Sequence, residues 1–193
     1  MITTATKEQW DKAQKLEYEY HLNDVRNFDD AYARYFDSYR QLFGLVGLSF
    51  ALHGKSVVEI GAGPYPALSY CKQHAYSYIV DPLYYDSYYV MLQGSLCYSK
   101  SLYMSMMYNE AWIFNCLQQV QDPDYIINWA KIHCAAVRFF EPIDLPVNDI
   151  HLHSFDLDYF KDRFGGVNLY EPKEYVKNFH SVKCAYGVWT KNN

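Results

Sequence analysis

The feature that most constrains the fold is an alternation of short apolar strands with helical segments after residue 55. The run SVVEI is β-branched and apolar, as a buried strand requires, and it ends at the glycine turn GAGPYP. The next segments are typical of a helix, ALSYCKQHA, and of a second strand, YSYIVDP. Strand, helix and strand within about thirty residues form the unit from which parallel sheets are built.

The same alternation continues toward the C-terminus. Three elements are predicted first: the apolar strand EAWIFNCL, the helix DPDYIINWAKIH and the strand CAAVRFFEP. LDYFKDRFGG then predicts a helix with a glycine stop, and FHSVKCAYGVWT predicts a terminal strand of alternating character. Strands that alternate with helices indicate a parallel sheet covered on both faces, with a ligand site at the carboxyl ends of the first strands.

Two helices are predicted before the first strand, over residues 7–20 and 28–43, because both segments lack Pro and Gly and carry apolar residues at helical spacing. We expect one domain over residues 1–193, with a helical cap at 1–50 and a core at 55–190, since half of the residues are apolar. Several aromatic residues of the cap would form either a lid over a ligand or a purely structural cover. They are Trp10, Tyr18, Tyr20, Tyr32 and Tyr35.

Charge and cysteine content narrow the function classes. The net charge of -5 disfavours a nucleic-acid partner, which normally requires clustered Lys and Arg. The five cysteines lack C-x-x-C spacing and are odd in number, which predicts reduced thiols rather than a disulfide framework. The sequence contains no signal-peptide pattern and no run of about 18 apolar residues, so we expect a cytoplasmic chain without a membrane span.

The strongest functional signal is the glycine turn after the first strand. Glu59 ends the strand, and Gly61 and Gly63 let the backbone approach a ligand closely. Asp81 ends the second strand, where a carboxylate accepts hydrogen bonds from ribose hydroxyls. Together these residues favour an adenosine-containing ligand over the alternative that they only shape a tight turn. Pro66 stands where a dinucleotide fingerprint has its third glycine, which argues against NAD and FAD.

With this turn, residues 55–190 resemble the class I, seven-strand, Rossmann-like S-adenosylmethionine-dependent methyltransferases. EIGAGP matches the acidic glycine loop of that family, and VDPL matches the acid that binds the ribose. The segment WIFNCLQQVQDPDYII is similar to the family's fourth strand and its exit. The resemblance implies S-adenosylmethionine as cofactor. The residues that it assigns to the cofactor are Glu59, Gly61, Ala62, Gly63, Asp81, Pro82, Leu83, Asn115, Cys116 and Leu117.

A narrower resemblance is to small methyltransferases of bacteria and their phages. These begin with a Trp-x-x-Ala-Gln helix, which Trp10, Ala13 and Gln14 match. They also carry a Phe-Glu-x-Ile-Asp stretch followed by His-x-His. The matching residues here are Phe140, Glu141, Ile143, Asp144, His151 and His153.

Two positions depart from the larger family. Gln118 and Gln119 stand where many relatives have Glu and His, and no acidic residue ends a third strand in LCYSKSLYMSMM, where relatives often hold the adenine. The catalytic residue is therefore left unassigned, since methyl transfer from a sulfonium mainly requires positioning of the acceptor. The tyrosine-rich DPLYYDSYY fits either packing or stacking on a ligand. The residues expected to contact the acceptor follow the fourth and fifth strands and are Gln119, Glu141, His151 and His153.

We expect a three-layer α/β sandwich around a mainly parallel seven-strand sheet with N-terminal capping helices and, by the resemblance, an antiparallel last strand. The expected function is methyl transfer from S-adenosylmethionine to a small molecule or a glycan. The alternatives are a non-catalytic S-adenosylmethionine-binding or scaffold protein, suggested by the two glutamines, and an enzyme acting on a nucleic acid or a protein. His151 and His153 offer two nitrogens, too few for a closed metal site, so no metal is expected.

Overall fold

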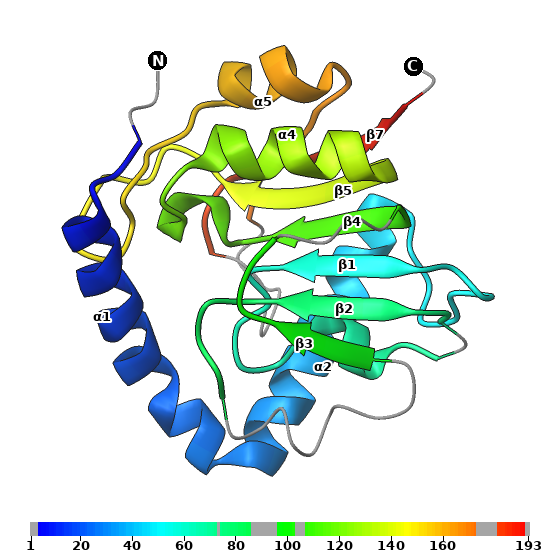
Figure 1. The fold of residues 1–193 in the computed structure, drawn as a ribbon, viewed down its shortest axis with the longest axis horizontal. Coiled ribbons are helices and arrows are strands. Elements are labelled where there is room, and N and C mark those ends of the chain that lie inside the picture. The colour runs from blue at the N-terminus through cyan, green and yellow to red at the C-terminus, as the bar shows by residue number, and fades with distance from the viewer. Residues whose placement is uncertain (1–3, 73, 86–95, 103–106, 173–180, 192–193) are drawn as a thin grey trace.

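The computed structural model describes residues 4–72, 74–85, 96–102, 107–172 and 181–191. A central sheet lies between two helical layers, with α4 and α5 on one face and α2 on the other (Figure 1). The expected three-layer α/β sandwich is confirmed. None of the helices within these ranges is long and apolar enough to cross a membrane.

Within the described ranges the sheet has seven strands in the order β3-β2-β1-β4-β5-β7-β6. Strands β1 to β5 run parallel to one another, whereas β7 pairs antiparallel with both β5 and β6. The predicted antiparallel last strand is thus confirmed. Strand order reverses between β1 and β4, which is where ligands bind in open parallel sheets. The strands are β1 (Val57–Ile60), β2 (Ser77–Val80), β3 (Leu96–Ser99), β4 (Tyr108–Phe114), β5 (Cys134–Pro142), β6 (Asn168–Tyr170) and β7 (Cys184–Thr190).

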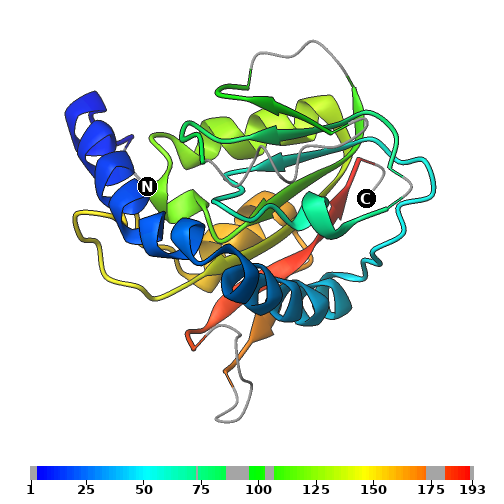
Figure 2. The ribbon, with the colours of Figure 1, turned by 90° about the horizontal axis from the view of Figure 1, so that it is seen from below.

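The helices include the two that were expected before the first strand, each extended by a few residues at its C-terminal end. Only Asn27 separates them, and Figure 2 shows α1 leading into α2 along one side of the molecule. The helix opened by Asp122 and the helix opened by Asp156 are also confirmed, and both aspartates accept a backbone N–H as N-caps. The helical elements are α1 (Lys7–Arg26), α2 (Phe28–Val46), η1 (Ala67–Tyr70), η2 (Leu117–Gln119), α4 (Pro123–His133) and α5 (Leu157–Phe164).

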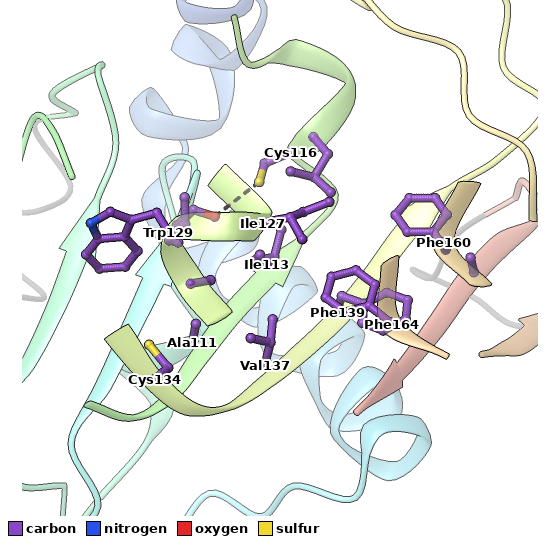
Figure 3. Close-up of a cluster of buried hydrophobic side chains, with 14 of the residues drawn as sticks. Ala111, Ile113, Cys116, Ile127, Trp129, Cys134, Val137, Phe139, Phe160 and Phe164 are labelled. Carbon is purple, nitrogen blue, oxygen red and sulfur yellow. Dashed lines mark hydrogen bonds between the residues drawn. The ribbon is translucent and has the colours of Figure 1, made fainter. Parts of the chain in front are cut away.

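Alternate strand residues pack against the two helical layers, which divides the core in two. Trp112 of β4 points to the α2 side, where it contacts Phe43 edge-on at 5.3 Å between ring centroids. Its neighbour Ile113 points to the opposite side, which carries α4 and α5 (Figure 3). This period of two explains why both faces of the central strands are mainly apolar, because both faces are covered.

One predicted helix is wrong. ALSYCKQHA forms only the short 3-10 helix η1, because the chain becomes extended at Cys71 and Lys72 then forms a parallel bridge with Ala51. The Lys72 N–H donates to the carbonyl of Phe50 at 2.7 Å, a tertiary bond that replaces a helical one. The short strand β6 was not predicted. All five cysteines are free thiols, and only Cys97 is not buried.

A buried ionic cluster ties α2 to the sheet. Glu110 of β4 accepts hydrogen bonds from Arg138 at 2.7 Å, Lys55 at 2.7 Å and the indole of Trp112 at 3.0 Å. Arg138 also donates to the carbonyl of Val46, the last residue of α2. Burial raises the pKa of Glu110, but the hydrogen bonds from its three donors outweigh burial and bring this pKa to about 2.

We predict that Glu110→Gln lowers the free energy of unfolding by about 3–5 kcal/mol at pH 7, because it leaves the largely buried Arg138 without its counter-charge. The pKa of Glu110 is depressed in the folded state, so its contribution is complete above about pH 4.5 and is lost as the pH falls toward 2. Urea unfolding at several pH values should therefore show the difference from the wild type shrinking in acid. Glu171→Gln, in an exposed pair 3.9 Å from Lys183, is the control and should cost less than about 1 kcal/mol. A difference that persists unchanged into acid would contradict this account.

Candidate active site

The glycine turn after β1 lies against the exit of β4. Gly61 has a φ of +65°, which favours glycine, and its N–H donates to the carbonyl of Val80 at 2.7 Å. A Cβ built on Gly61 would lie 2.4 Å from the Cβ of Cys116. The Cys116 thiol in turn donates to the carbonyl of Ile60 at 3.2 Å, the contact drawn in Figure 3. Only glycine therefore fits at position 61.

Glu59 lies beneath this turn rather than beside a ligand. Its side chain is buried, and its two carboxyl oxygens accept the backbone N–H groups of Ala67 at 2.7 Å and Leu68 at 2.8 Å. Burial raises the pKa of Glu59 to about 8, against the effect of these two hydrogen bonds. Its role in the structure is to hold the turn and η1 in place, and it lines neither of the cavities described below.

Asp81 joins the exit of β2 to the same turn. Its carboxyl oxygens accept the N–H of Gly63 at 2.9 Å and the N–H of Leu83 at 2.8 Å. Burial raises the pKa of Asp81 to about 6. Each carboxylate oxygen has further acceptor capacity, and Asp81 lines a cavity, so it remains able to accept hydroxyl groups of a ligand.

The segment that follows β4 is held in place by hydrogen bonds to a residue of β5. Asn115, with a φ of +58°, is left-handed although it is not glycine, a strain that often marks functional sites. After it, the N–H groups of Cys116 and Leu117 donate to the two oxygens of Glu141 at 3.0 and 3.1 Å. Glu141 is fully buried and lines neither cavity. The structure thus places Glu141 inside the fold, with both of its oxygens bound to backbone, rather than at a cavity wall.

Helix α1 runs beside the carboxyl ends of β1, β2 and β4 (Figure 1), and a cavity of about 460 Å³ lies between them. We call it the first cavity. It is lined by residues from α1, from the exits of β1, β2, β3 and β4, and from the segment leading into α4 and its first turn. Its walls are formed by Trp10, Gln14, Glu17, Ile60, Gly61, Val80, Asp81, Pro82, Lys100, Ser101, Leu102, Cys116, Gln119, Val120, Gln121, Asp122, Tyr125 and Ile126.

A second cavity, of about 400 Å³, lies on the other side of the glycine turn. Helix α2 contributes most of one wall, and the exit of β4 contributes the opposite one. Glu17, Gly61 and Gln119 line both cavities, so the two meet at these residues. The remaining walls of the second cavity are His21, Arg34, Tyr35, Ser38, Tyr39, Leu42, Ala62, Gly63, Pro64, Phe114, Asn115, Ser181 and Val182.

Most of the residues assigned to the cofactor from the sequence come together at these cavities. Leu117 is fully buried and Leu83 contributes its N–H to Asp81, and neither lines a cavity wall. Those that do are Gly61, Ala62, Gly63, Asp81, Pro82, Asn115 and Cys116.

Of the four residues assigned to the acceptor, Gln119 lines both of these cavities, and the other three line neither of them. His153 is buried, and its Nε2 lies 2.8 Å from the carbonyl of Val120. The Nδ1 of His151 lies 3.4 Å from the amide nitrogen of Asn148. Both histidines contact the loop segments around them and lie outside the walls of these two cavities.

Sequence reasoning named Trp10 as a candidate lid residue but missed the rest of the cavity face of α1. Trp10, Gln14, Glu17 and His21 line the cavities at intervals of three or four residues, the spacing of one helical face. That spacing was present in the sequence and was not used.

Of the tyrosine-rich segment DPLYYDSYY, the structure describes residues as far as Tyr85; the tyrosines beyond it lie outside the described residues. Tyr85 is buried and stacks on Tyr18 of α1 at 5.6 Å between ring centroids, so this ring packs against the cap.

The chain matches no model of a protein family and no curated protein sequence. Its fold does match solved structures. One is 1,6-didemethyltoxoflavin-N1-methyltransferase of Burkholderia thailandensis with bound 1,6-didemethyltoxoflavin and S-adenosylhomocysteine. Its TM-score is 0.62 at 13% identity, over 99% of this chain and 92% of that one.

Two further matches also contain S-adenosylhomocysteine. N-methyltransferase NodS of Bradyrhizobium japonicum has a TM-score of 0.57 and 9% identity, covering 92% of this chain and 99% of that one. A plantazolicin methyltransferase has a TM-score of 0.53 and 11% identity, covering 95% and 99% respectively. With its sheet order and antiparallel β7, the chain has the fold of the class I S-adenosylmethionine-dependent methyltransferases.

Proposed function

We propose that this chain transfers a methyl group from S-adenosylmethionine to a small organic acceptor. The observation that carries the proposal is the pair of cavities that meet at the Gly61 turn, because methyl transfer requires two molecules to meet end to end. Cavities of about 400 Å³ and 460 Å³ are of the size that holds small ligands. The five free thiols fit the reducing cytoplasm, where we place the enzyme.

The first cavity fits the adenosine part of the cofactor. Asp81 lines it and would accept the ribose hydroxyls, and the apolar side chains of Ile60, Val80 and Leu102 would hold the adenine. Gly61, which has no room for a side chain, would let the backbone lie close to the rest of the molecule. When bound, S-adenosylmethionine supplies a methyl group that its sulfonium charge has already activated.

The protein's own part is to orient the acceptor and exclude water. Helices α1 and α2 form the outer walls of the cavities, so an acceptor in the second cavity would be enclosed between α2 and the β4 exit. A scaffold that only bound the cofactor would have no use for this second cavity. For this reason we favour an enzyme over the non-catalytic alternative, although Gln118 and Gln119 offer no general base at the family's usual position.

We predict that S-adenosylmethionine and S-adenosylhomocysteine each raise the melting temperature, because a ligand that binds only the folded state stabilises it by mass action. At a concentration of about one hundred times Kd the gain is about 2.7 kcal/mol. For a chain of this length that gain corresponds to roughly 5–11 °C. Differential scanning fluorimetry measures the shift, and NAD serves as the control that should give none. An equal shift with NAD would remove the cofactor assignment.

Asp81→Ala should weaken S-adenosylhomocysteine binding by on the order of 1.5–3 kcal/mol, the usual contribution of a charged hydrogen-bond partner. Isothermal titration calorimetry gives the affinity, and the unfolding of each free variant shows whether the fold survives. Asp158→Ala is the matched control, since Asp158 is exposed and pairs with Lys161 on its own helix, so binding should not change. Equal losses at the two positions would take the ribose role from Asp81.

Gly61→Ala should lower S-adenosylhomocysteine affinity by at least about tenfold, because its Cβ collides with Cys116 and displaces the β4 exit. Gly54→Ala separates this effect from backbone strain. Gly54 also has a positive φ, +79°, but a Cβ there meets nothing within 4 Å. Gly54→Ala should lower the free energy of unfolding by about 1–2 kcal/mol and leave the affinity for S-adenosylhomocysteine unchanged. The same affinity for both variants would show that the close contact is irrelevant to binding.

A further inference from the structure

Among the residues that the structure describes, Glu17 is the one ionisable side chain common to the walls of both cavities. The other two shared residues are Gly61, which has no side chain, and Gln119, which is neutral. Glu17 lies on α1, outside every motif that suggested the fold. Its position is where the reactive end of a molecule in one cavity would meet a molecule in the other.

The carboxyl group of Glu17 has no partner of opposite charge among the residues that the structure describes. Arg34, which lines the second cavity, lies 2.5 Å from Asp24. Lys100, which lines the first cavity, is exposed and forms no ion pair with Glu17. No described group donates a hydrogen bond to Glu17 either. Burial, and after it the charge of Asp81, raise the pKa of Glu17 to about 8. A carboxyl in this setting is stabilised in its charged form by a cation that enters the cavity.

The groups that face Glu17 from the neighbouring elements do not supply that cation. Asp81 at the β2 exit carries the same charge, and Tyr85 and Cys116 have pKa values raised by burial, so both stay neutral. His21 follows one turn later on α1. Burial lowers the pKa of His21 below 6.5, against the effect of Asp24, so its imidazole is mainly neutral at pH 7.

The rest of the second cavity offers ring faces and apolar surface. The hydroxyl of Tyr39 donates to the carbonyl of Tyr65 at 2.8 Å, and that of Tyr35 donates to Asp24 at 3.4 Å. With their hydroxyls so engaged, Tyr35 and Tyr39 contribute aromatic surface to the wall, beside Leu42 and Phe114. The second cavity thus combines one unpaired carboxyl group with an aromatic and aliphatic wall.

We propose that the acceptor is a basic amine on an aromatic or aliphatic body, and that Glu17 binds the protonated nitrogen and removes its proton. This inference rests on the proposed function and adds the class of acceptor and a catalytic residue. Of the ligands that suit the cavity, an ammonium group supplies the charge that Glu17 lacks, whereas an alcohol or a sugar does not.

The proposed step balances as follows. The ammonium R–NH₃⁺ gives one proton to a carboxylate oxygen of Glu17, which frees the nitrogen lone pair. That pair forms the bond to the methyl carbon while the bond between this carbon and sulfur breaks, and the bonding pair stays on the sulfur of S-adenosylhomocysteine. The product R–NH₂CH₃⁺ leaves as a cation, and Glu17 returns its proton to water.

The test uses the whole chain saturated with S-adenosylhomocysteine, with 2-phenylethylamine and its uncharged counterpart 2-phenylethanol as probes. Ligand-observed NMR titrations at pH 7 should show the amine binding at least about tenfold more tightly than the alcohol. Glu17→Gln should remove this preference while S-adenosylhomocysteine affinity stays within about threefold. Glu17→Asp, which keeps the carboxyl group, should retain part of the preference for the amine. Glu19→Gln, the same change at an exposed residue of the same helix, should behave as the wild type.

Four outcomes overturn the inference. They are failure of the amine to bind, equal binding of amine and alcohol to the wild type, a preference that survives Glu17→Gln, and a Glu17→Gln variant whose main defect is in S-adenosylhomocysteine binding. The last outcome would show that Glu17 binds the cofactor rather than the acceptor. If S-adenosylhomocysteine does not bind the wild type at all, the proposed function itself fails, and this result is separate from the other four.

Discussion

Three buried carboxyl groups hold the carboxyl-terminal edge of the sheet in shape. Glu59, Asp81 and Glu141 lie near the ends of β1, β2 and β5, and each accepts two backbone N–H groups from an adjoining turn. These N–H groups have no strand partner, and a buried one left unsatisfied costs about 1–3 kcal/mol. Burial raises the pKa of all three carboxyl groups, which shows the electrostatic penalty that these hydrogen bonds offset. The cavities depend on these turns being rigid.

The helical cap forms the outer walls of the cavities that begin at the sheet edge. The glycine turn separates the two cavities, but α1 and α2 form their outer walls, and α1 brings an ionisable group that both cavities share, Glu17. The cap is held by Asp24 at the end of α1, which pairs with Arg34 of α2 and whose carbonyl accepts the hydroxyl of Tyr65 at 2.7 Å. In our proposal, the sheet edge thus binds the methyl donor, S-adenosylmethionine, and the cap binds the methyl acceptor.

Local sequence pattern predicted the elements whose signals are local. The β-branched run before Gly61 and the Asp122 cap before Pro123 each depend on a few neighbouring residues, and both are found as expected. The helix predicted after Pro66 fails because Lys72 instead pairs with Ala51, a partner that periodicity does not reveal. β6 was missed because three residues, two of them exposed, carry too little pattern.

The sequence by itself therefore determined most of the strands and helices and placed acidic residues at the strand exits, because periodicity and turn chemistry act between near neighbours. Only the tertiary structure decided what each acidic residue does. Asp81 lines a cavity while Glu59 and Glu141 bind backbone, and Glu17 reaches both cavities from a distant helix. The reason is physical: the environment of a carboxyl group is set by the segments that fold against it, and those segments lie far away along the chain.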